Sequence, residues 1–333
     1  MVICGGLSNE RDISLLSGRQ VYQNLDTKKY NAYLVDVSQT GWKILDQSKA
    51  GNFLKEKKRT LSLVTFSGMM KKIAESADVA FLALHGQFGE DGQIQALFDI
   101  VGIPYTGSGV LGSSLAMDKY RSTQLAEYVG LDVPKSLLVF KTDLTPTLYT
   151  KIEKVLGFPC FVKPNRSGSS VGSGIATNKA ILKEKLQDAF SHDSEVIIQE
   201  RIVGRELTCA VFGNTGLTVT PFPPVEIKTD ALFFDRNVKY DSKTIELCPA
   251  PLSKTQTKHI QEYASVIHQA LGCNGVTRSD FILADSGIFY YLETNTIPGL
   301  TETSLAPKEA RAYGLSFKEY IDLQIITAQQ NHD

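Results

Sequence analysis

Two β-rich runs joined by a turn, in the stretch 277–296, constrain the fold of this chain more than any other feature. The stretch reads TRSDFILADSGIFYYLETNT, with β-branched and aromatic residues on both sides of a short polar segment. Gly287 in that segment supplies the positive φ that a tight turn needs. We therefore predict a β-hairpin with Ser286 and Gly287 as a two-residue loop.

The register of this predicted hairpin places acidic side chains opposite each other. Asp280 then lies across from Glu293, and Arg278 lies across from Asn295 on the same face. Two carboxylates about 5 Å apart repel each other unless a cation lies between them. Oxygen ligands with an amide nearby, and no histidine or thiolate, favour Mg²⁺. The alternative is a solvated hairpin edge whose charges only keep the sheet soluble.

Composition narrows the class of protein. The chain has 333 residues, more than one hydrophobic core usually supports, so two or three packed units are expected. Its 35 basic and 36 acidic residues give no field that would recruit nucleic acid or an anionic membrane. The five cysteines are scattered and form no CxxC pair, which argues against disulfides and zinc. No apolar run is long enough to span a bilayer and no signal peptide is evident, so we expect a cytoplasmic protein.

The pattern of strands and helices divides the chain into three expected units. Over residues 1–107, short apolar strands alternate with helical stretches, which is typical of a parallel α/β unit. Residues 108–203 and 204–333 are expected to form two α+β units. In the last unit, the polar segment from Pro223 to Pro251 is long enough to contain an active-site flap. The expected strands are 2–4, 32–37, 78–84, 136–140, 159–163 and 195–200, and the expected helices include 13–25, 117–130 and 316–327.

Two lysines are candidates for phosphate binding. Lys163 ends the apolar strand FPCFVKP and is followed directly by the flexible segment NRSGSSVGSG. Backbone amides and a lysine together can hold phosphates, but a glycine-serine surface loop has the same composition. Lys119, taken alone, is better explained as a solvated lysine on a helix.

The sequence of segment 107–112 matches the glycine pattern of a dinucleotide-binding site. It reads GSGVLG, follows a strand-like run and precedes a helix, as in a Rossmann fold. That signature requires an acidic residue at the end of the next strand, whereas Glu127, at about the right distance, lies within the expected helix. We therefore reject an NAD site. No GxxxxGK[ST] motif occurs, which also argues against an ordinary P-loop.

Five sequence blocks follow one another across nearly the whole chain. They are GGLSNERDISLLSG from Gly5, LHGQFGEDG from Leu84, YTGSGVLGSSLAMDK from Tyr105, VKPNRSGSSVG from Val162, and TRSDF with LETNTIPGLTETSL near the end. Two further blocks, QERIVGRELT and FFDRNVKYDSKT, lie between them. In this order they resemble the D-alanine–D-alanine ligases of the ATP-grasp superfamily. The resemblance implies three domains, with ATP held between two α+β domains and the amino acids held against the N-terminal α/β domain.

The resemblance implies roles for the nucleotide and metal residues. Lys119 and Lys163 resemble the lysines that bind ATP phosphates, and Lys239 resembles a flap residue that reaches phosphate. Glu206 resembles a ribose ligand. The adenine-binding hinge corresponds to Gln199, Glu200, Arg201 and Ile202. The ligands of two Mg²⁺ ions, a site that would also accept Mn²⁺, correspond to Asp280, Glu293 and Asn295.

On the side of the first amino acid, Glu10 resembles the carboxylate that holds the D-alanine ammonium group. His85 lies near the same subsite, and Ser169 and Tyr240 resemble polar partners of Glu10. Considered singly, these residues have plainer interpretations. Glu10 would favour the positive end of a helix dipole, His85 would be a satisfied histidine at a strand end, and Tyr240 would be an exposed loop tyrosine.

On the side of the second amino acid, Arg278 and the backbone amide of Gly299 resemble the pair that stabilises an oxyanion. Ser304 and Leu305 resemble the receptor of the second substrate's carboxylate, although Ser304 alone could be a loop or cap hydroxyl. The implied reaction forms D-alanyl-D-alanine through an acyl phosphate and supplies peptidoglycan synthesis. Two alternatives remain: a ligase with D-lactate, D-serine or another acceptor, and a ligase-like binding protein without turnover. A homodimer is also implied, with ATP and D-alanine as its only other partners.

Overall fold

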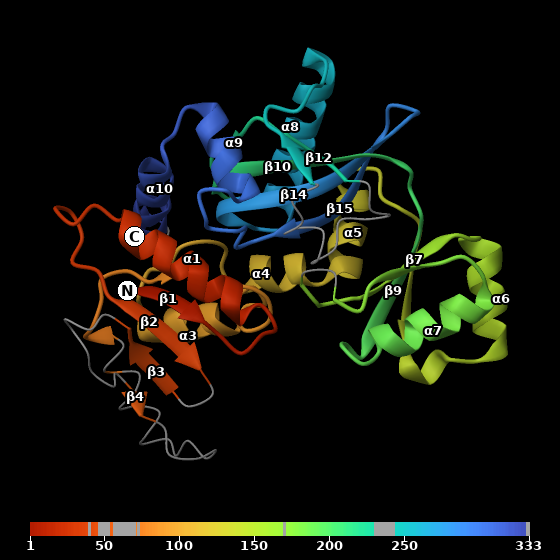
Figure 1. Cartoon of the computed structure of the whole chain (residues 1–333), viewed down its shortest axis with the longest axis horizontal. Coiled ribbons are helices and arrows are strands. Elements are labelled where there is room, and N and C mark those ends of the chain that lie inside the picture. The colour runs from red at the N-terminus through yellow and green to blue at the C-terminus, as the bar shows by residue number, and fades with distance from the viewer. Residues whose placement is uncertain are drawn as a thin grey trace.

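Three sheets and the helices packed on them form the molecule (Figure 1). The structure is a computed structural model and describes residues 1–38, 41–45, 54–55, 71, 74–168, 171–229 and 244–330. Each sheet lies within one of the three units expected from the sequence. The boundaries of those units at residues 107 and 203 stay a prediction, because several helices pack across them.

The N-terminal unit is built around a five-stranded sheet. Its elements are β1 (Val2–Gly5), α1 (Arg11–Asn24), β2 (Leu34–Ser38), β3 (Gly41–Ile44), β4 (Leu54–Lys55), β5 (Phe81–Leu82) and α3 (Gln93–Val101). The strand order is β4-β3-β2-β1-β5, with β1 parallel to β2 and β5. The expected parallel α/β arrangement is confirmed, and β3 and β4 extend it with antiparallel pairing. Helix α1 packs closely on β1, because a side chain at Gly18 would collide with Cys4.

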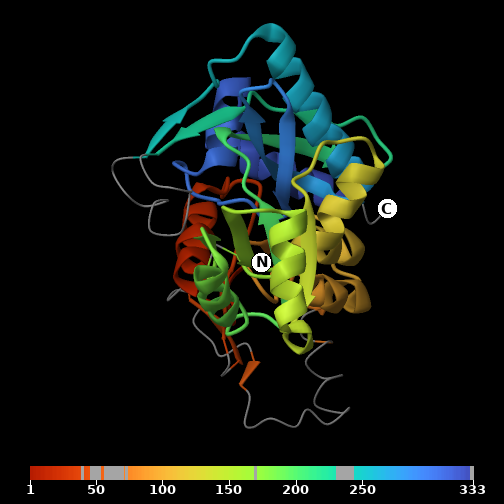
Figure 2. The same ribbon diagram turned by 90° about the vertical axis from the view of Figure 1, so that its right-hand side faces the viewer.

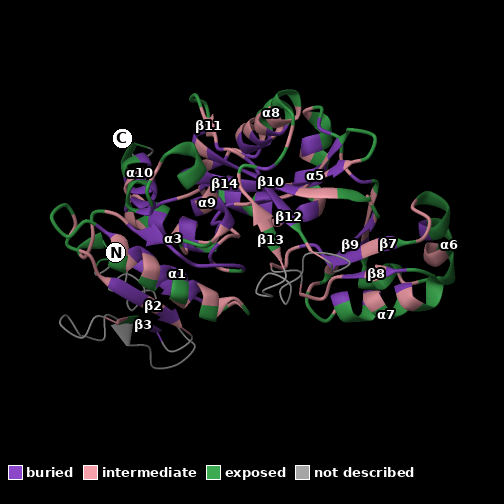
Figure 3. Ribbon diagram, turned by 45° about the horizontal axis from the view of Figure 1, so that its top comes forward, coloured by how far each residue is buried: buried purple, intermediate pink, exposed green. Residues whose placement is uncertain are grey.

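The central unit is a four-stranded sheet with two helices. Its elements are β6 (Ser136–Phe140), α6 (Pro146–Val155), β7 (Cys160–Pro164), β8 (Gly174–Ala176), α7 (Lys179–Ala189) and β9 (Glu195–Glu200). The order is β6-β9-β7-β8, with all neighbours antiparallel. Ile152 of α6 and Leu182 of α7 are buried in one core with Val162 and Val196 of the sheet. Figure 3 shows exposed residues on the outer sides of both helices.

The C-terminal unit has the largest sheet. Its elements are β10 (Gly204–Asn214), β11 (Thr220–Pro221), β12 (Val225–Lys228), β13 (Ile245–Leu247), α8 (Lys254–Ala270), β14 (Asn274–Ala284) and β15 (Phe289–Asn295). The order is β13-β12-β10-β14-β15, and β11 also pairs with β10. Strands β10 and β14 are long and central, so residues on them are held rigidly on both sides.

Strands β14 and β15 form the predicted hairpin, but its loop differs from the prediction. The Gly287 N–H donates to the carbonyl of Ala284 at 2.8 Å, and the Ala284 N–H donates to that of Ile288 at 2.9 Å. The loop therefore comprises the three residues 285–287, and the predicted two-residue loop is wrong. Gly287 has a φ of +87°, so the expected positive φ at this glycine is confirmed.

A β-bulge compensates for the longer loop. The register shifts between Asp280 and Phe281, because Leu292 is an extra residue on β15. The two irregularities offset each other, so the pairings at the far end of the hairpin are those predicted: Asp280 with Glu293, and Arg278 with Asn295.

The helical stretch expected over 117–130 belongs to two helices, α4 (Val110–Met117) and α5 (Lys119–Tyr128). The break falls at Asp118, whose extended backbone ends α4 and whose carboxylate caps α5 by accepting the Arg121 N–H. Both helices pack on the C-terminal sheet, where Ala116 and Ala126 share a core with Phe281. The start of α5 is thereby fixed beside the hairpin.

Helices α9 (Leu305–Tyr313) and α10 (Phe317–Gln330) bring the C-terminal segment back to the N-terminal unit. Ala306, Ala310 and Tyr320 lie in the same buried core as Ile3 and other residues of the first sheet. Figure 1 shows α9 beside the third sheet and α10 above the N-terminal unit, and Figure 2 shows the blue C-terminal unit above the red N-terminal one. None of the helices in the described ranges has the length and apolar character required to cross a bilayer.

Candidate active site

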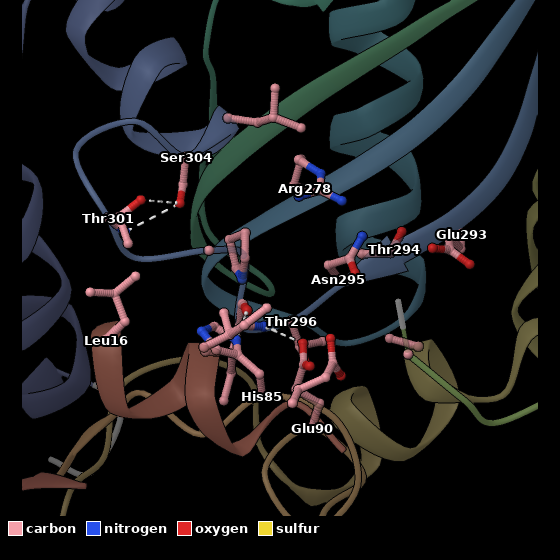
Figure 4. A pocket seen from close by; sticks show the side chains of 18 of the residues that line it. Leu16, His85, Glu90, Arg278, Glu293, Thr294, Asn295, Thr296, Thr301 and Ser304 are labelled. Atoms are coloured by element: carbon pink, nitrogen blue, oxygen red, sulfur yellow. Dashed lines mark hydrogen bonds between the residues drawn. The ribbon is translucent and has the colours of Figure 1, made fainter. Parts of the chain in front are cut away.

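A cavity of about 600 Å³ lies where the three units meet, between α1, the start of α5, β15 and the segment leading into α9. Figure 4 shows Arg278 and Asn295 on one wall, with His85 and Glu90 on the wall below. Residues from all three units line it, so no unit could form it alone. Nine of the predicted site residues belong to the lining: Glu10, His85, Lys119, Arg278, Glu293, Asn295, Gly299, Ser304 and Leu305.

The hairpin places its charged groups in one network. Arg278 donates from Nε and Nη2 to the two oxygens of Asp280 at 2.8 and 2.9 Å. Asn295 donates to Asp280 Oδ2 at 3.3 Å. Burial opposes the charge on Arg278, but the Asp280 carboxylate outweighs it and raises the arginine pKa. Arg278 is therefore a permanent cation held in a fixed orientation.

The two predicted phosphate lysines converge on the hairpin acids. Lys119 Nζ lies 3.4 Å from Glu293 Oε2 and donates to the carbonyl of Ser167 at 2.8 Å. Its position is fixed by Asn165, whose side-chain oxygen accepts the Tyr120 N–H at 2.8 Å. Lys119 is 9% exposed, so the plainer interpretation as a solvated lysine is wrong.

Lys163 reaches the same region from β7. Burial lowers the pKa of the Lys163 amine from 10.5 to about 8. The Glu293 carboxylate partly offsets this shift, and the charge of Lys119 adds to it. Glu293 is thus close to two lysines from the neighbouring unit. A cluster of this kind, with two lysines and two acids, is suited to a ligand that brings both phosphates and cations.

Replacing Lys163 with methionine is expected to stabilise the free protein by about 1–3 kcal/mol at pH 7, because burying the charged amine opposes folding. Between pH 8 and 10.5 the unfolded chain binds this proton more tightly than the folded chain, so wild-type stability rises with pH there. The variant should lack that rise. Chemical denaturation from pH 7 to 10 measures both effects, with Lys183→Met, an exposed lysine of α7, as control. A less stable Lys163→Met protein at pH 7 would contradict the prediction.

Glu10 lies between two glycine-containing loops. A Cβ at Gly86 would lie 2.5 Å from Glu10 Oε2, and a Cβ at Gly168 would collide with the same carboxylate. The loop that contains Gly168 follows β7 of the central unit, whereas Glu10 precedes α1 of the N-terminal unit. The phosphate-binding candidate loop therefore contacts Glu10 at Gly168, and a larger residue there would displace the Glu10 carboxylate.

His85 is held by protein groups through both ring nitrogens. Its Nδ1 lies 3.1 Å from the carbonyl of Ile297, which can only accept, so Nδ1 carries the proton. Nε2 then accepts from the hydroxyl of Ser17 at 2.8 Å. Burial lowers the pKa of His85, which also favours the neutral ring. His85 lines the cavity as predicted and shapes its wall.

The segment before α9 brings Gly299 against Ser304. A Cβ at Gly299 would lie 2.7 Å from the Ser304 hydroxyl, so a larger residue would displace that side chain. The hydroxyl also accepts the Thr301 N–H at 3.2 Å. The loop thus curls around Ser304 at the start of α9.

Glu90 is a lining residue that the sequence interpretation missed. Its carboxylate accepts the N–H of Gly86 at 2.7 Å and that of Ile297 at 3.0 Å, which ties the first wall to the segment after β15. Burial, and then the charge of Glu10, raise the pKa of Glu90 to about 8. Its position within the block LHGQFGEDG was the available signal.

The predicted adenine and ribose residues lie outside the cavity lining. Gln199 donates to the Ser136 hydroxyl at 2.9 Å, and Glu200 accepts the Lys135 N–H at 2.8 Å. Arg201 and Ile202 connect β9 to β10, and Glu206 lies on β10. These roles stay predictions. Ser169, Lys239 and Tyr240 fall outside the described residues, as do residues 230–243 of the predicted flap.

The glycines of the segment 107–112 serve close packing. A Cβ at Gly112 would lie 2.6 Å from the carbonyl of Gly272, at the contact of α4 with the C-terminal unit. A Cβ at Gly275 would lie 3.1 Å from Gly107. The resemblance of this segment to a dinucleotide motif is therefore explained by contacts between backbones.

Two α+β units meet at this cavity, one supplying Lys163 from its sheet and Lys119 from the start of α5, the other supplying the hairpin acids. With a parallel α/β unit as the third wall, this arrangement defines an ATP-grasp ligase. Models of two families match the chain: "D-ala D-ala ligase N-terminus" over residues 1–108 and "D-ala D-ala ligase C-terminus" over 125–327. The chain belongs to the D-alanine–D-alanine ligase family.

Relatives and solved structures agree with this assignment. The chain is 38% identical to D-alanine–D-alanine ligase B of Clostridium perfringens, over 98% of this chain and 97% of that relative. It is also 38% identical to the D-alanine–D-alanine ligase of Syntrophobacter fumaroxidans, over 99% and 97%. The VanG D-Ala:D-Ser ligase of Enterococcus faecalis superposes with a TM-score of 0.81 at 32% identity, covering 98% of both chains. The ATP complex of the Bacillus anthracis D-alanine–D-alanine ligase gives 0.78 at 30%, covering 99% and 96%.

Proposed function

We propose that this chain joins two D-alanine molecules at the expense of ATP, through a D-alanyl phosphate. The first carboxylate attacks the γ-phosphorus and ADP leaves; the amine of the second D-alanine then attacks the acyl carbon and phosphate leaves. The observation that supports this most strongly is that Glu10, Lys119, Arg278 and Glu293 line one cavity. Lys163 is close enough to Glu293 to feel its charge, and Asp280 is bonded to Arg278. Both steps place negative charge on oxygen, which fixed cations stabilise.

The donor set fits Mg²⁺. Asp280 and Glu293 are opposed carboxylates, and the Asn295 amide, which donates through its nitrogen to Asp280, keeps its oxygen as a third possible metal ligand. Among the described residues, no site is formed by three or more histidines, cysteines and acids, so the proposed ligands are two acids and an amide. Two ions held by these residues would neutralise the phosphates of ATP, and Mn²⁺ would fit the same ligands.

The protein's own side chains and amides bind the substrates and stabilise the charges that develop. Lys119 and Lys163 hold the phosphates, and Arg278 with the Gly299 N–H meets the oxyanion of the tetrahedral intermediate. Glu10 holds the first ammonium, and the start of α9 at Ser304 and Leu305 receives the second carboxylate. The remaining assignments concern adenine and ribose (Gln199, Glu200, Arg201, Ile202 and Glu206), the partners of Glu10 (Ser169 and Tyr240), and a flap contact to phosphate (Lys239).

D-Serine is the main alternative to D-alanine as the acceptor, because the VanG neighbour is named as a D-Ala:D-Ser ligase. Phosphate release with ATP, Mg²⁺ and D-alanine alone, or with added D-serine or D-lactate, separates the three acceptors. D-alanine alone should give a rate at least as high as either mixture. A product that is mostly D-alanyl-D-serine would overturn the acceptor assignment, and no phosphate release at all would indicate a binding protein.

Replacing Glu10 with glutamine is expected to raise KM for the first D-alanine by about 10²-fold, since a charge-assisted contact of this half-buried carboxylate to the ammonium is lost. KM for ATP should stay within about twofold. Asp12→Asn, an exposed acid at the start of the same helix, is the matched control. Steady-state kinetics measure both constants, and an unchanged D-alanine KM in Glu10→Gln would remove Glu10 from the site.

We also propose that the protein is a cytoplasmic homodimer that supplies dipeptide for peptidoglycan precursors. We keep 1–107, 108–203 and 204–333 as its three domains. Light scattering on the purified protein tests the dimer, with a mass near 73 kDa expected for two chains of 36.6 kDa.

A further inference from the structure

Glu309 is a buried acid that the reaction does not use. It lies on α9 and has no exposed surface. One of its oxygens accepts the backbone N–H of Ala210, on β10. The other oxygen, Oε1, is buried and has no hydrogen-bond partner among the described residues. Burying an acid with one unpartnered oxygen costs free energy of folding, and the hydrogen bond to Ala210 is the contact that offsets this cost.

The Ala210 N–H faces a gap in the sheet. Strand β11 pairs with β10 as far as Val211, and β12 pairs with it from Thr208. Between them Phe222 donates to the Ala210 carbonyl at 2.8 Å, whereas the Ala210 N–H donates to the Glu309 carboxyl group. Glu309 fills that position, so α9 replaces a strand partner at this point.

Ala210 is also the neighbour of Arg278. The two residues pair directly across β10 and β14. The N–H and carbonyl of Ala210 point away from β14, so this is a non-hydrogen-bonded pair, in which the Cα atoms lie only about 4.5 Å apart. The contact of Glu309 is therefore one strand away from the arginine assigned to the oxyanion.

Glu309 lies one turn after the start of α9. Leu305 and Glu309 are four residues apart and face the same side of the helix. Leu305 packs on Val225 and Ile227 of β12. The first turn of α9 is thus attached to the sheet by one apolar contact and one hydrogen bond.

Burial favours the neutral form of the Glu309 carboxyl group. Burial raises its pKa to about 8, while the Ala210 N–H and then Arg278 oppose the shift and Asp280 adds to it. A protonated acid needs no counter-ion, and glutamine has nearly the same shape with an oxygen that can accept the same N–H.

We propose that Glu309 is a positioning residue that fixes the start of α9, and with it the receptor for the acceptor carboxylate, to the strand beside Arg278. This inference rests on the proposed roles of Ser304, Leu305 and Arg278. It implies that Glu309 influences the second half of the reaction and leaves acyl phosphate formation unchanged.

The test compares two acceptors of the acyl phosphate. Hydroxylamine carries no carboxylate, so it traps the intermediate as a hydroxamate without the receptor at α9, whereas D-alanine requires that receptor. In Glu309→Met, which has similar length and no acceptor oxygen, KM for the second D-alanine should rise about tenfold. The rate of hydroxamate formation should stay within about twofold of wild type. Glu309→Gln should restore dipeptide formation to within about twofold.

Hydrogen exchange provides an independent readout, because the amide of Ala210 should exchange faster in Glu309→Met and at the wild-type rate in Glu309→Gln. Glu262→Met, an exposed acid on α8, is the control for the substitution itself. If Glu309→Met does not fold, Glu309→Asp is the substitute, because its shorter side chain moves the carboxyl group away from the Ala210 N–H. The same changes in KM and in exchange rate are expected for it.

Three results would overturn the proposal: equal loss of hydroxamate and dipeptide, a Glu309→Gln variant as impaired as Glu309→Met, or wild-type kinetics in Glu309→Met. Wild-type protein that makes hydroxamate but no dipeptide would instead refute the proposed acceptor, so the two failures are distinguishable.

Discussion

Asp280→Asn is expected to lower kcat by about 10³-fold at saturating ATP and Mg²⁺, since a metal and phosphate network of this kind contributes several kcal/mol to the transition state. Asparagine keeps an oxygen for Arg278, which now bonds both carboxylate oxygens at 2.8 and 2.9 Å, so the fold should survive. The Mg²⁺ concentration for half-maximal rate should rise as well. Phosphate release over a Mg²⁺ titration measures both effects.

The same hairpin offers a matched control. Asp285 lies in the exposed loop at the other end, and Asp285→Asn makes the same chemical change far from the cavity. We expect wild-type rates for that variant. Full turnover in Asp280→Asn, or an equal loss in both variants, would show that the hairpin does not bind the catalytic metal.

Arg278→Lys is expected to lower kcat by about 10²–10³-fold, although the positive charge is kept. Lysine cannot bond both oxygens of Asp280, so its ammonium group would not be held where the oxyanion forms. KM for ATP should change by less than about threefold, because the arginine acts on the acyl centre. Steady-state and single-turnover rates with D-alanine check the prediction.

The C-terminal sheet contains a second forked pair that serves as control. Arg205 donates from Nε and Nη2 to Glu226 at 2.8 and 2.9 Å, and it is not part of the cavity lining. Arg205→Lys should leave kcat unchanged. An Arg278→Lys enzyme as active as Arg205→Lys would exclude an oxyanion role for Arg278.

The pairing of the site residues across the hairpin could be predicted, because side chains alternate between the two faces along each strand. The residues that face one side repeat every two positions, so the chemistry of the face can be read from the sequence. The loop length could not, since Gly287 suits two- and three-residue loops equally. The bulge at Leu292 has no local signature, and the pairing of Asp280 with Glu293 was correct only because the two irregularities offset each other.

Burial of charged residues was the least predictable property. Lys119 has a surface interpretation in the sequence and Glu90 was not singled out there, and the burial of both depends on segments that lie far away along the chain. Lys119 is enclosed by residues that include Ser167 and Glu293, and Glu90 bonds Ile297. Glu309 gave no signal at all, because its role arises from a gap between β11 and β12 that only the folded sheet contains.

The break at Asp118 was recognisable in principle. Aspartate is a strong N-cap residue, and the sequence placed it inside a helical stretch. The prediction followed the periodicity and missed the cap. The Asp118 cap bears on function, because it starts α5 at Lys119 and so places that lysine beside Glu293 of the hairpin.

The most direct measurement is an anomalous difference map of crystals grown with Mn²⁺ and a non-hydrolysable ATP analogue. We predict two manganese peaks between the terminal phosphates and the side chains of Asp280, Glu293 and Asn295, with Lys119 and Lys163 on the phosphates. Manganese bound only elsewhere, or phosphates seated away from the hairpin, would contradict the account.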